Sequence, residues 1–184
     1  HPMSDSLSLA QADMRSAYRD GGAGVLASSL AWLSAGIATL KASPQQAVWV
    51  LFIGGMAIHP VSTVLCKLFG STGKHAKGNP LGVLAIATVF WLIFSLPLAY
   101  VVSLYRIEWF FLAMLLVIGG RYLTFHTLFG LRVYWILGLA LAAAGYLLGR
   151  MLATPTTSAF TGSAIELAFA IYMLVGSRRT ATTG

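Results

Sequence analysis

Three ionisable residues, His59, Arg121 and Glu166, lie inside strongly apolar stretches of the sequence, where ionisable groups usually serve a function. A guanidinium binds carboxylate or phosphate groups, a glutamate can act as a counter-ion or proton carrier, and a histidine can transfer protons near neutral pH. These residue types together favour a polar pocket for an anionic or polar group.

Arg121 lies twelve residues after Trp109, which is ~18 Å along a helix. Its side chain leans toward the start of its own helix, away from the nearer membrane surface, so snorkelling to that surface works against the backbone. We therefore expect a buried arginine with a partner. Glu166 is the only acidic residue within any other apolar stretch, so the sequence predicts an Arg121–Glu166 pair, either functional or a purely structural clasp.

His59 has small and polar neighbours on one helical face, namely Gly55, Ser62 and Thr63 at positions i−4, i+3 and i+4. Pro60 removes a backbone hydrogen bond and predicts a kink at this point. This pattern is typical of a cavity wall, although a histidine bonded to an adjacent helix would look the same. With Arg121, Tyr122 and Glu166, these residues complete the candidate pocket: His59, Ser62, Thr63, Arg121, Tyr122 and Glu166.

His126 is the fourth residue to weigh, and it follows Arg121 by five positions. It therefore points about 140° away from Arg121 around the helix and should lie outside the pocket. A haem between His59 and His126 is disfavoured by their different depths. With one cysteine and no zinc, nucleotide-binding or paired-carboxylate motif, we expect no cofactor and no metal.

The residues that must position this pocket belong to a membrane protein, since 58% of the 184 residues are hydrophobic and 9% are charged. Six stretches approach the ~20 residues that cross ~30 Å of hydrocarbon as a helix. They predict an all-α polytopic bundle of six transmembrane helices within residues 22–176. The spans are 22–40, 46–69, 81–103, 109–129, 133–152 and 159–176.

The basic residues lie in the connectors, so the net charge of +7 indicates topology rather than nucleic-acid binding. With a cytoplasmic N-terminus, eight lie inside and three outside, which predicts that both termini are cytoplasmic. The inside set is Arg15, Arg19, Lys67, Lys74, Lys77, Arg132, Arg178 and Arg179, and the outside set is Lys41, Arg106 and Arg150. By the expected depths, a pocket among spans two, four and six would open toward the extracytoplasmic side.

Residues 1–21 precede the first span, and the initial His1 and Pro2 are taken as a cloning remnant before Met3. The rest predicts a cytoplasmic interfacial helix, with Ser8 and Gln11 spaced as a capping box and Gly21 as a stop, or alternatively a partly ordered tail. The first span could instead be a cleaved signal sequence. Residues 177–184 are expected to form a cytoplasmic tail.

Gly145 and Gly149 form a small-residue step in span five, extended by Gly138 and Ala142 on the same face. Such a face supports either an internal helix contact or a homodimer interface.

Two stretches, GNPLGVLAIATVFWLIFSLPLAYVV (78–102) and GGRYLTFHTLFGLRVYWILG (119–138), carry a family resemblance. The marks are Asn79-Pro80-Leu81-Gly82, Pro97, and the step Gly119, Gly120, Arg121 and Tyr122. These stretches resemble DUF7010, a family of uncharacterised small bacterial multipass membrane proteins. The resemblance implies six helices and a bacterial inner-membrane location, with no activity to carry over. Histidine is frequent at the polar position of that family, so Arg121 departs from its pattern while keeping a polar site.

The leading hypothesis is a small transporter or ligand-binding membrane protein, in which Arg121 holds the ligand, Glu166 acts as counter-ion or proton-coupling group, and His59 forms the pocket floor. The alternatives are a membrane-embedded or lipid-modifying enzyme that uses His59 as a base, and an accessory subunit. The expected partners are membrane lipids, a small polar or anionic ligand and a second copy of the chain, and not nucleic acid.

Overall fold

The computed structural model describes residues 2–181, and the regular structure within them is helical. Six of its helices are long and apolar enough to cross a membrane, which confirms the predicted all-α, six-helix architecture. The elements in chain order are α1 (Pro2–Tyr18), the 3-10 turn η1 (Arg19–Gly21), α2 (Gly22–Lys41), α3 (Pro44–Leu68), α4 (Leu81–Tyr105), α5 (Ile107–Phe129), α6 (Val133–Arg150) and α7 (Pro155–Ala181).

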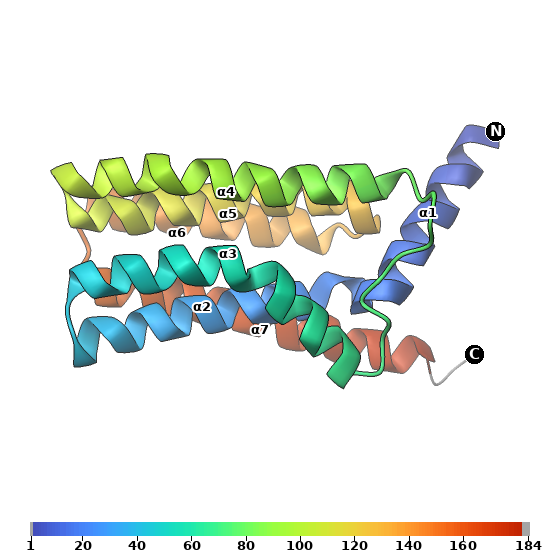
Figure 1. Ribbon diagram of the computed structural model, residues 1–184, viewed down its shortest axis with the longest axis horizontal. Coiled ribbons are helices and arrows are strands. Elements are labelled where there is room, and N and C mark those ends of the chain that lie inside the picture. Colours follow the sequence, from blue (N-terminus) through green and yellow to red (C-terminus); the bar gives the residue numbers. More distant parts are fainter. Residues whose placement is uncertain (1, 182–184) are drawn as a thin grey trace.

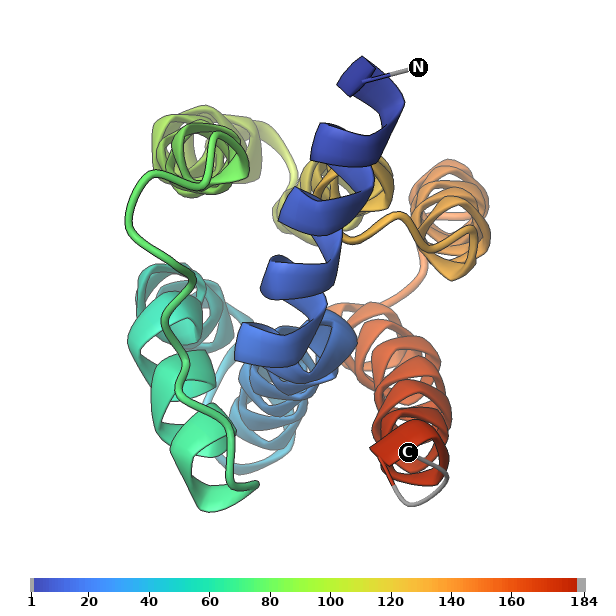
Figure 2. The same cartoon turned by 90° about the vertical axis from the view of Figure 1, so that its right-hand side faces the viewer.

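The six long helices run side by side, and α1 crosses one end of the bundle (Figures 1 and 2). The carboxyl end of α7 lies at this same end (Figure 1). We call it the α1 end; it also contains the 69–80 loop and the last turn of α5. The first and last helices therefore reach the same side of the bundle, as an even number of spans requires.

The bundle consists of two three-helix layers that face each other (Figure 2). In one layer α2 packs extensively against both α3 and α7, and in the other α5 packs against α4 and α6. Large side chains fill the space between them, and Trp32, Phe110 and Tyr134 are completely buried. Packing between the layers is much sparser at both edges, between α3 and α4 and between α6 and α7.

Glycines allow α5 and α6 to approach closely. A Cβ atom on Gly119 would lie 2.8 Å from the carbonyl oxygen of Gly138, and one on Gly138 would lie 2.6 Å from that of Gly119. The small-residue face of α6 is therefore used inside the chain, because Gly145 and Gly149 likewise face side chains of α5. Of the two interpretations of that face, the internal contact is the one present.

Helix α3 bends in its second half and turns away from α4 (Figure 1). Pro60 lies inside this helix, and its ring nitrogen cannot donate the hydrogen bond that the Met56 carbonyl would otherwise accept. The predicted kink is confirmed. Its consequence is that α3 diverges from α4 toward the α1 end.

Helix α1 begins earlier than the sequence pattern indicates. Ser8 lies within the helix and its hydroxyl bonds to the carbonyl of Asp5 at 2.9 Å, so the predicted capping box is wrong. Helix α1 ends at Tyr18, three residues before the predicted stop at Gly21, and Gly21 closes the following turn with φ +82° in the left-handed region that glycine favours. Arg19 and Asp20 also have positive φ values of 52° and 58°, and these three residues redirect the chain from α1 into α2.

Candidate functional site

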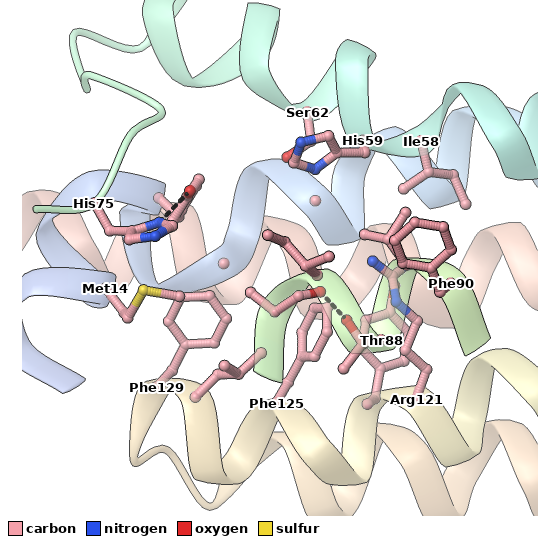
Figure 3. Close-up of a pocket in the computed structure, with 18 residues that line it drawn as sticks. Met14, Ile58, His59, Ser62, His75, Thr88, Phe90, Arg121, Phe125 and Phe129 are labelled. Atoms are coloured by element: carbon pink, nitrogen blue, oxygen red, sulfur yellow. Dashed lines mark hydrogen bonds between the residues drawn. The ribbon is translucent and has the colours of Figure 1, made fainter. Parts of the chain in front are cut away.

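A cavity of about 360 Å³ lies between α3, α4 and α5 at the α1 end, where the bend of α3 leaves room (Figure 3). Its wall is mostly apolar, with polar groups at a few places. It is lined by Met14, Tyr18, Gly21, Gly24, Ile58, His59, Ser62, His75, Ala85, Ile86, Thr88, Val89, Phe90, Arg121, Tyr122, Phe125, Leu128 and Phe129.

Arg121 is the cation of this cavity. Only 8% of its surface is exposed, and Figure 3 shows the guanidinium directed into the cavity toward Phe90 and Ile58. Its central carbon lies 5.0 Å from the centre of the Phe125 ring, a cation–π contact. The guanidinium has no hydrogen-bond or ion-pair partner among the described residues, and its buried Nε atom is unsatisfied.

Glu166 does not pair with Arg121. It is completely buried on α7, where Oε1 accepts a hydrogen bond of 3.0 Å from the hydroxyl of Ser28 on α2, and Oε2 has no hydrogen-bond partner within residues 2–181. The predicted ion pair is therefore wrong, although the two side chains are near enough to interact electrostatically. The reason is that α7 presents Glu166 to the interface with α2, whereas Arg121 turns toward the gap beside α3.

Four of the six predicted site residues line the cavity, namely His59, Ser62, Arg121 and Tyr122. Thr63 does not, because its hydroxyl bonds back to the carbonyl of His59 at 3.1 Å. Glu166 does not line the cavity; it interacts with Tyr122, whose side chain also interacts with Arg121.

His126 lies outside the cavity, as its helical position predicts. Its Nδ1 atom is 3.1 Å from the carbonyl of Leu131, close to the end of α5. No group of three or more histidine, cysteine, aspartate or glutamate side chains within the described part of the chain is placed to hold a metal ion.

Sequence reasoning missed the walls that come from other helices. Thr88 and Phe90 reach the cavity from α4, and Met14 and Tyr18 reach it from α1. Phe125 was detectable, since it follows Arg121 by four residues and so shares its helical face. The other contributions depend on how the helices pack, which local spacing does not encode.

The cavity lies at the α1 end and not at the opposite end. Arg121 precedes the end of α5 by eight residues, so it lies roughly 12 Å from that end. If the N-terminus is cytoplasmic, the α1 end is the cytoplasmic end and the cavity lies in the cytoplasmic half. The predicted cytoplasmic N-terminus and the predicted extracytoplasmic opening therefore exclude each other. Glu166, the shallowest residue of the expected pocket, does not line the cavity.

Helix α1 and the 69–80 loop cover the cavity at this end. Gln11 Nε2 and Arg15 Nη1 donate hydrogen bonds of 2.9 and 2.6 Å to carbonyl groups in the last turn of α5, at Thr127 and Phe129. The hydroxyl of Tyr18 lies 2.9 Å from Nδ1 of His75 in the loop.

The carboxylate of Asp13 provides a further link between α1 and the loop. It accepts hydrogen bonds from the Asn79 side chain at 2.7 Å and from the backbone N–H of Ala76 at 2.9 Å. These bonds favour the charged form and hold the pKa of Asp13, which lies outside the spanning helix α2, below its ordinary value. The cover is therefore fixed to the bundle by several independent polar contacts.

Comparison with known proteins extends the resemblance carried by residues 78–102 and 119–138. No curated protein and no solved structure matches the chain. A model of a family of unknown function, DUF7010, matches residues 7–176, which include all residues that line the cavity, five of the spanning helices and α7 up to Gly176. The chain therefore belongs to DUF7010, a family of unknown function.

Proposed function

We propose that this protein is a small transporter or ligand-binding membrane protein whose cavity holds an organic anion at Arg121. The observation that carries the proposal is a guanidinium, 8% exposed, that points into a cavity and has no partner among the described residues. Burying an unpaired charge costs several kcal/mol. An anionic group beside Arg121 would offset that cost and would gain charge-assisted hydrogen bonds.

The rest of the wall suits a ligand with an apolar body. Ile58, Phe90 and Phe125 surround the position to which the guanidinium points (Figure 3). Ligand sites of this kind combine an apolar lining with a few polar groups that set orientation. Ser62 and His59 lie on the opposite wall, on α3, and can contact a second polar group of the ligand.

Glu166 has a separate role in this proposal. It interacts with Tyr122 and has no ion pair among the described residues, so it can balance the charge of Arg121 at longer range when the cavity holds no anion. In a transporter, the same carboxyl group is the candidate for coupling anion movement to a proton. We propose that transport uses a homodimer, since six helices are few for a carrier.

The test measures binding in nanodiscs of phosphatidylcholine, with benzoate, octanoate and inorganic phosphate as probes. We expect benzoate or octanoate to bind the wild type, and Arg121→Gln to weaken that binding at least tenfold, because a hydrogen bond to a charged group contributes about 1.5–3 kcal/mol. Arg132→Gln is the matched control, since Arg132 is exposed and lies outside the cavity. If none of the anions distinguishes wild type from Arg121→Gln, the proposal is wrong.

Flux measurements then separate the functional classes. A transporter moves the bound anion across proteoliposomes, and Glu166→Gln abolishes proton-coupled movement. A binding protein retains the anion without flux. Chemical conversion of the anion in detergent, without any gradient, would instead indicate the enzyme alternative based on His59.

A further inference from the structure

We propose that the ligand is an acidic amphiphile that enters the cavity sideways from the bilayer, between α3 and α4. Its acidic head lies at Arg121 and its hydrocarbon chain extends outward to the lipid. This inference rests on the proposed function and specifies the substrate class and the route of entry.

The first observation is that one side wall of the cavity is also outer surface. His59 on α3 lines the cavity and is exposed, and the exposed fractions of Ile86 and Phe90 on α4 are 58% and 52%. Side chains that line a cavity and are also exposed mark its opening. We call the opening formed by His59, Ile86 and Phe90 the side portal.

The side portal lies at the depth of the hydrocarbon. Ile86 and Phe90 follow the start of α4 by five and nine residues, which places them roughly 8 and 14 Å along a helix that is long enough to cross the membrane. Exposed apolar side chains flank the portal, with Val61 and Val64 on α3 and Val83 on α4. A molecule that enters there comes from lipid and not from water.

In contrast to the side portal, the end of the cavity under α1 and the 69–80 loop is closed. Tyr18 and His75, which line that end, lie within hydrogen-bond distance of each other, and Met14 lies beside them (Figure 3). Arg19 fixes the loop by donating hydrogen bonds from Nε to the hydroxyl of Ser71 at 3.0 Å and from Nη2 to the carbonyl of Phe69. Because the cover is tied down by these bonds, the side portal is the open route.

The chemistry of the cavity matches a molecule with one acidic end. A single buried cation, Arg121, faces a wall that is otherwise largely apolar, so a carboxylate or phosphate head can meet the guanidinium while a chain contacts Ile58 and Phe90. The chain leaves at the side portal, where lining residues of α3 and α4 are also exposed. A cavity of about 360 Å³ needs to hold only the head and the first part of the chain.

The experiment uses a photoreactive hexadecanoic acid with a mid-chain diazirine, added to the protein in phosphatidylcholine nanodiscs. We expect labelled peptides from α3 and α4 around the side portal, and at least tenfold less labelling in Arg121→Gln. Phe90→Trp, which narrows the portal, should reduce labelling several-fold. Phe94→Trp is the matched control, because Phe94 is exposed on the same helix and does not line the cavity.

Competition distinguishes the two sources of an acidic amphiphile. Unlabelled oleic acid should compete if the natural ligand is a free fatty acid, and phosphatidylglycerol should compete if it is an anionic phospholipid; either result supports the proposal. Labelling that is insensitive to Arg121→Gln, or confined to α1 and the 69–80 loop, would overturn it. If benzoate binding depends on Arg121 but fatty-acid labelling does not, lateral entry is wrong and anion binding stands. If neither depends on Arg121, both fail.

Discussion

At the scale of single residues, Arg121 keeps a charge inside the bundle at a cost in stability. It is buried and unpartnered among the described residues, and its clearest contact is with the ring of Phe125. Such a group is retained where function requires it, because stability and activity often conflict at binding sites. The ligand-free protein should therefore become more stable when this charge is removed.

Arg121→Met tests this directly. Methionine fills a similar space without a charge, so we expect the thermal unfolding midpoint of the ligand-free protein to rise, by the equivalent of about 1–3 kcal/mol. Differential scanning calorimetry in one detergent, with Arg132→Met as the control on an exposed arginine, gives the measurement. A fall of about 3 kcal/mol or more would mean that Arg121 has a buried partner.

The sequence predicted Arg121, His59, Ser62 and Tyr122 because polar side chains in apolar helices are conspicuous whatever the tertiary structure. It did not predict the partner of Glu166. The partner of a buried carboxylate depends on how its helix is rotated and which helices lie beside it. Ser28 is a small hydroxyl residue on another span, so the sequence does not mark it as the partner.

At the scale of elements, α5 and α6 form the platform that carries Arg121. Gly119 lies two residues before it and contacts the backbone of α6, whereas a Cβ atom added to Gly120 would have no neighbour within 4 Å. A methyl group would therefore clash with α6 at Gly119 and would have free space at Gly120.

Gly119→Ala should destabilise the protein by about 1–3 kcal/mol, because overpacking forces the two backbones apart. Gly120→Ala should be neutral or stabilising by up to about 1 kcal/mol, since alanine favours the helix. Urea or thermal unfolding of both variants checks the difference. Equal effects of the two substitutions would show that close approach of α5 and α6 is unimportant.

Elements were predictable where a local rule applied. The six spans follow from length and hydropathy, and the bend of α3 follows from Pro60. The start of α1 was not predicted correctly. Ser8 fits a capping pattern, but the helix begins before it and Ser8 does not cap it. The pairing of α2 with α7 is a long-range contact that no local pattern records.

At the scale of the whole molecule, α1 and the 69–80 loop join the two layers across the α1 end (Figure 2). Asp13 connects them through hydrogen bonds to its charged form, and these lower the pKa of Asp13 in the folded state. Its stabilising contribution is therefore present above the ordinary pKa of an aspartate, about 4, and is lost as the pH falls through the folded pKa.

Acidification should accordingly loosen the cover. We expect faster hydrogen exchange of α1 backbone amides at pH 3 than at pH 6, after correction for intrinsic rates, and a smaller difference in Asp13→Asn. Asp5→Asn is the control, because Asp5 is exposed on the same helix, well before the contact with the loop. If the effect of pH on hydrogen exchange is the same in Asp13→Asn as in the wild type, a group other than Asp13 causes it.

The order in which the chain is made adds a consequence. Gln11 and Arg15 leave the ribosome early, but their acceptors in α5 are 116 and 114 positions later. Ser28 in the first span meets Glu166 in the last, 138 positions apart. During synthesis the side chains of Gln11 and Arg15 lack these acceptors until α5 is made, and α2 lies in the bilayer with Ser28 unsatisfied until α7 is made. Insertion of α7 is therefore the step that completes the bundle, and a nascent chain that stops earlier exposes the polar side chains of α2 to lipid.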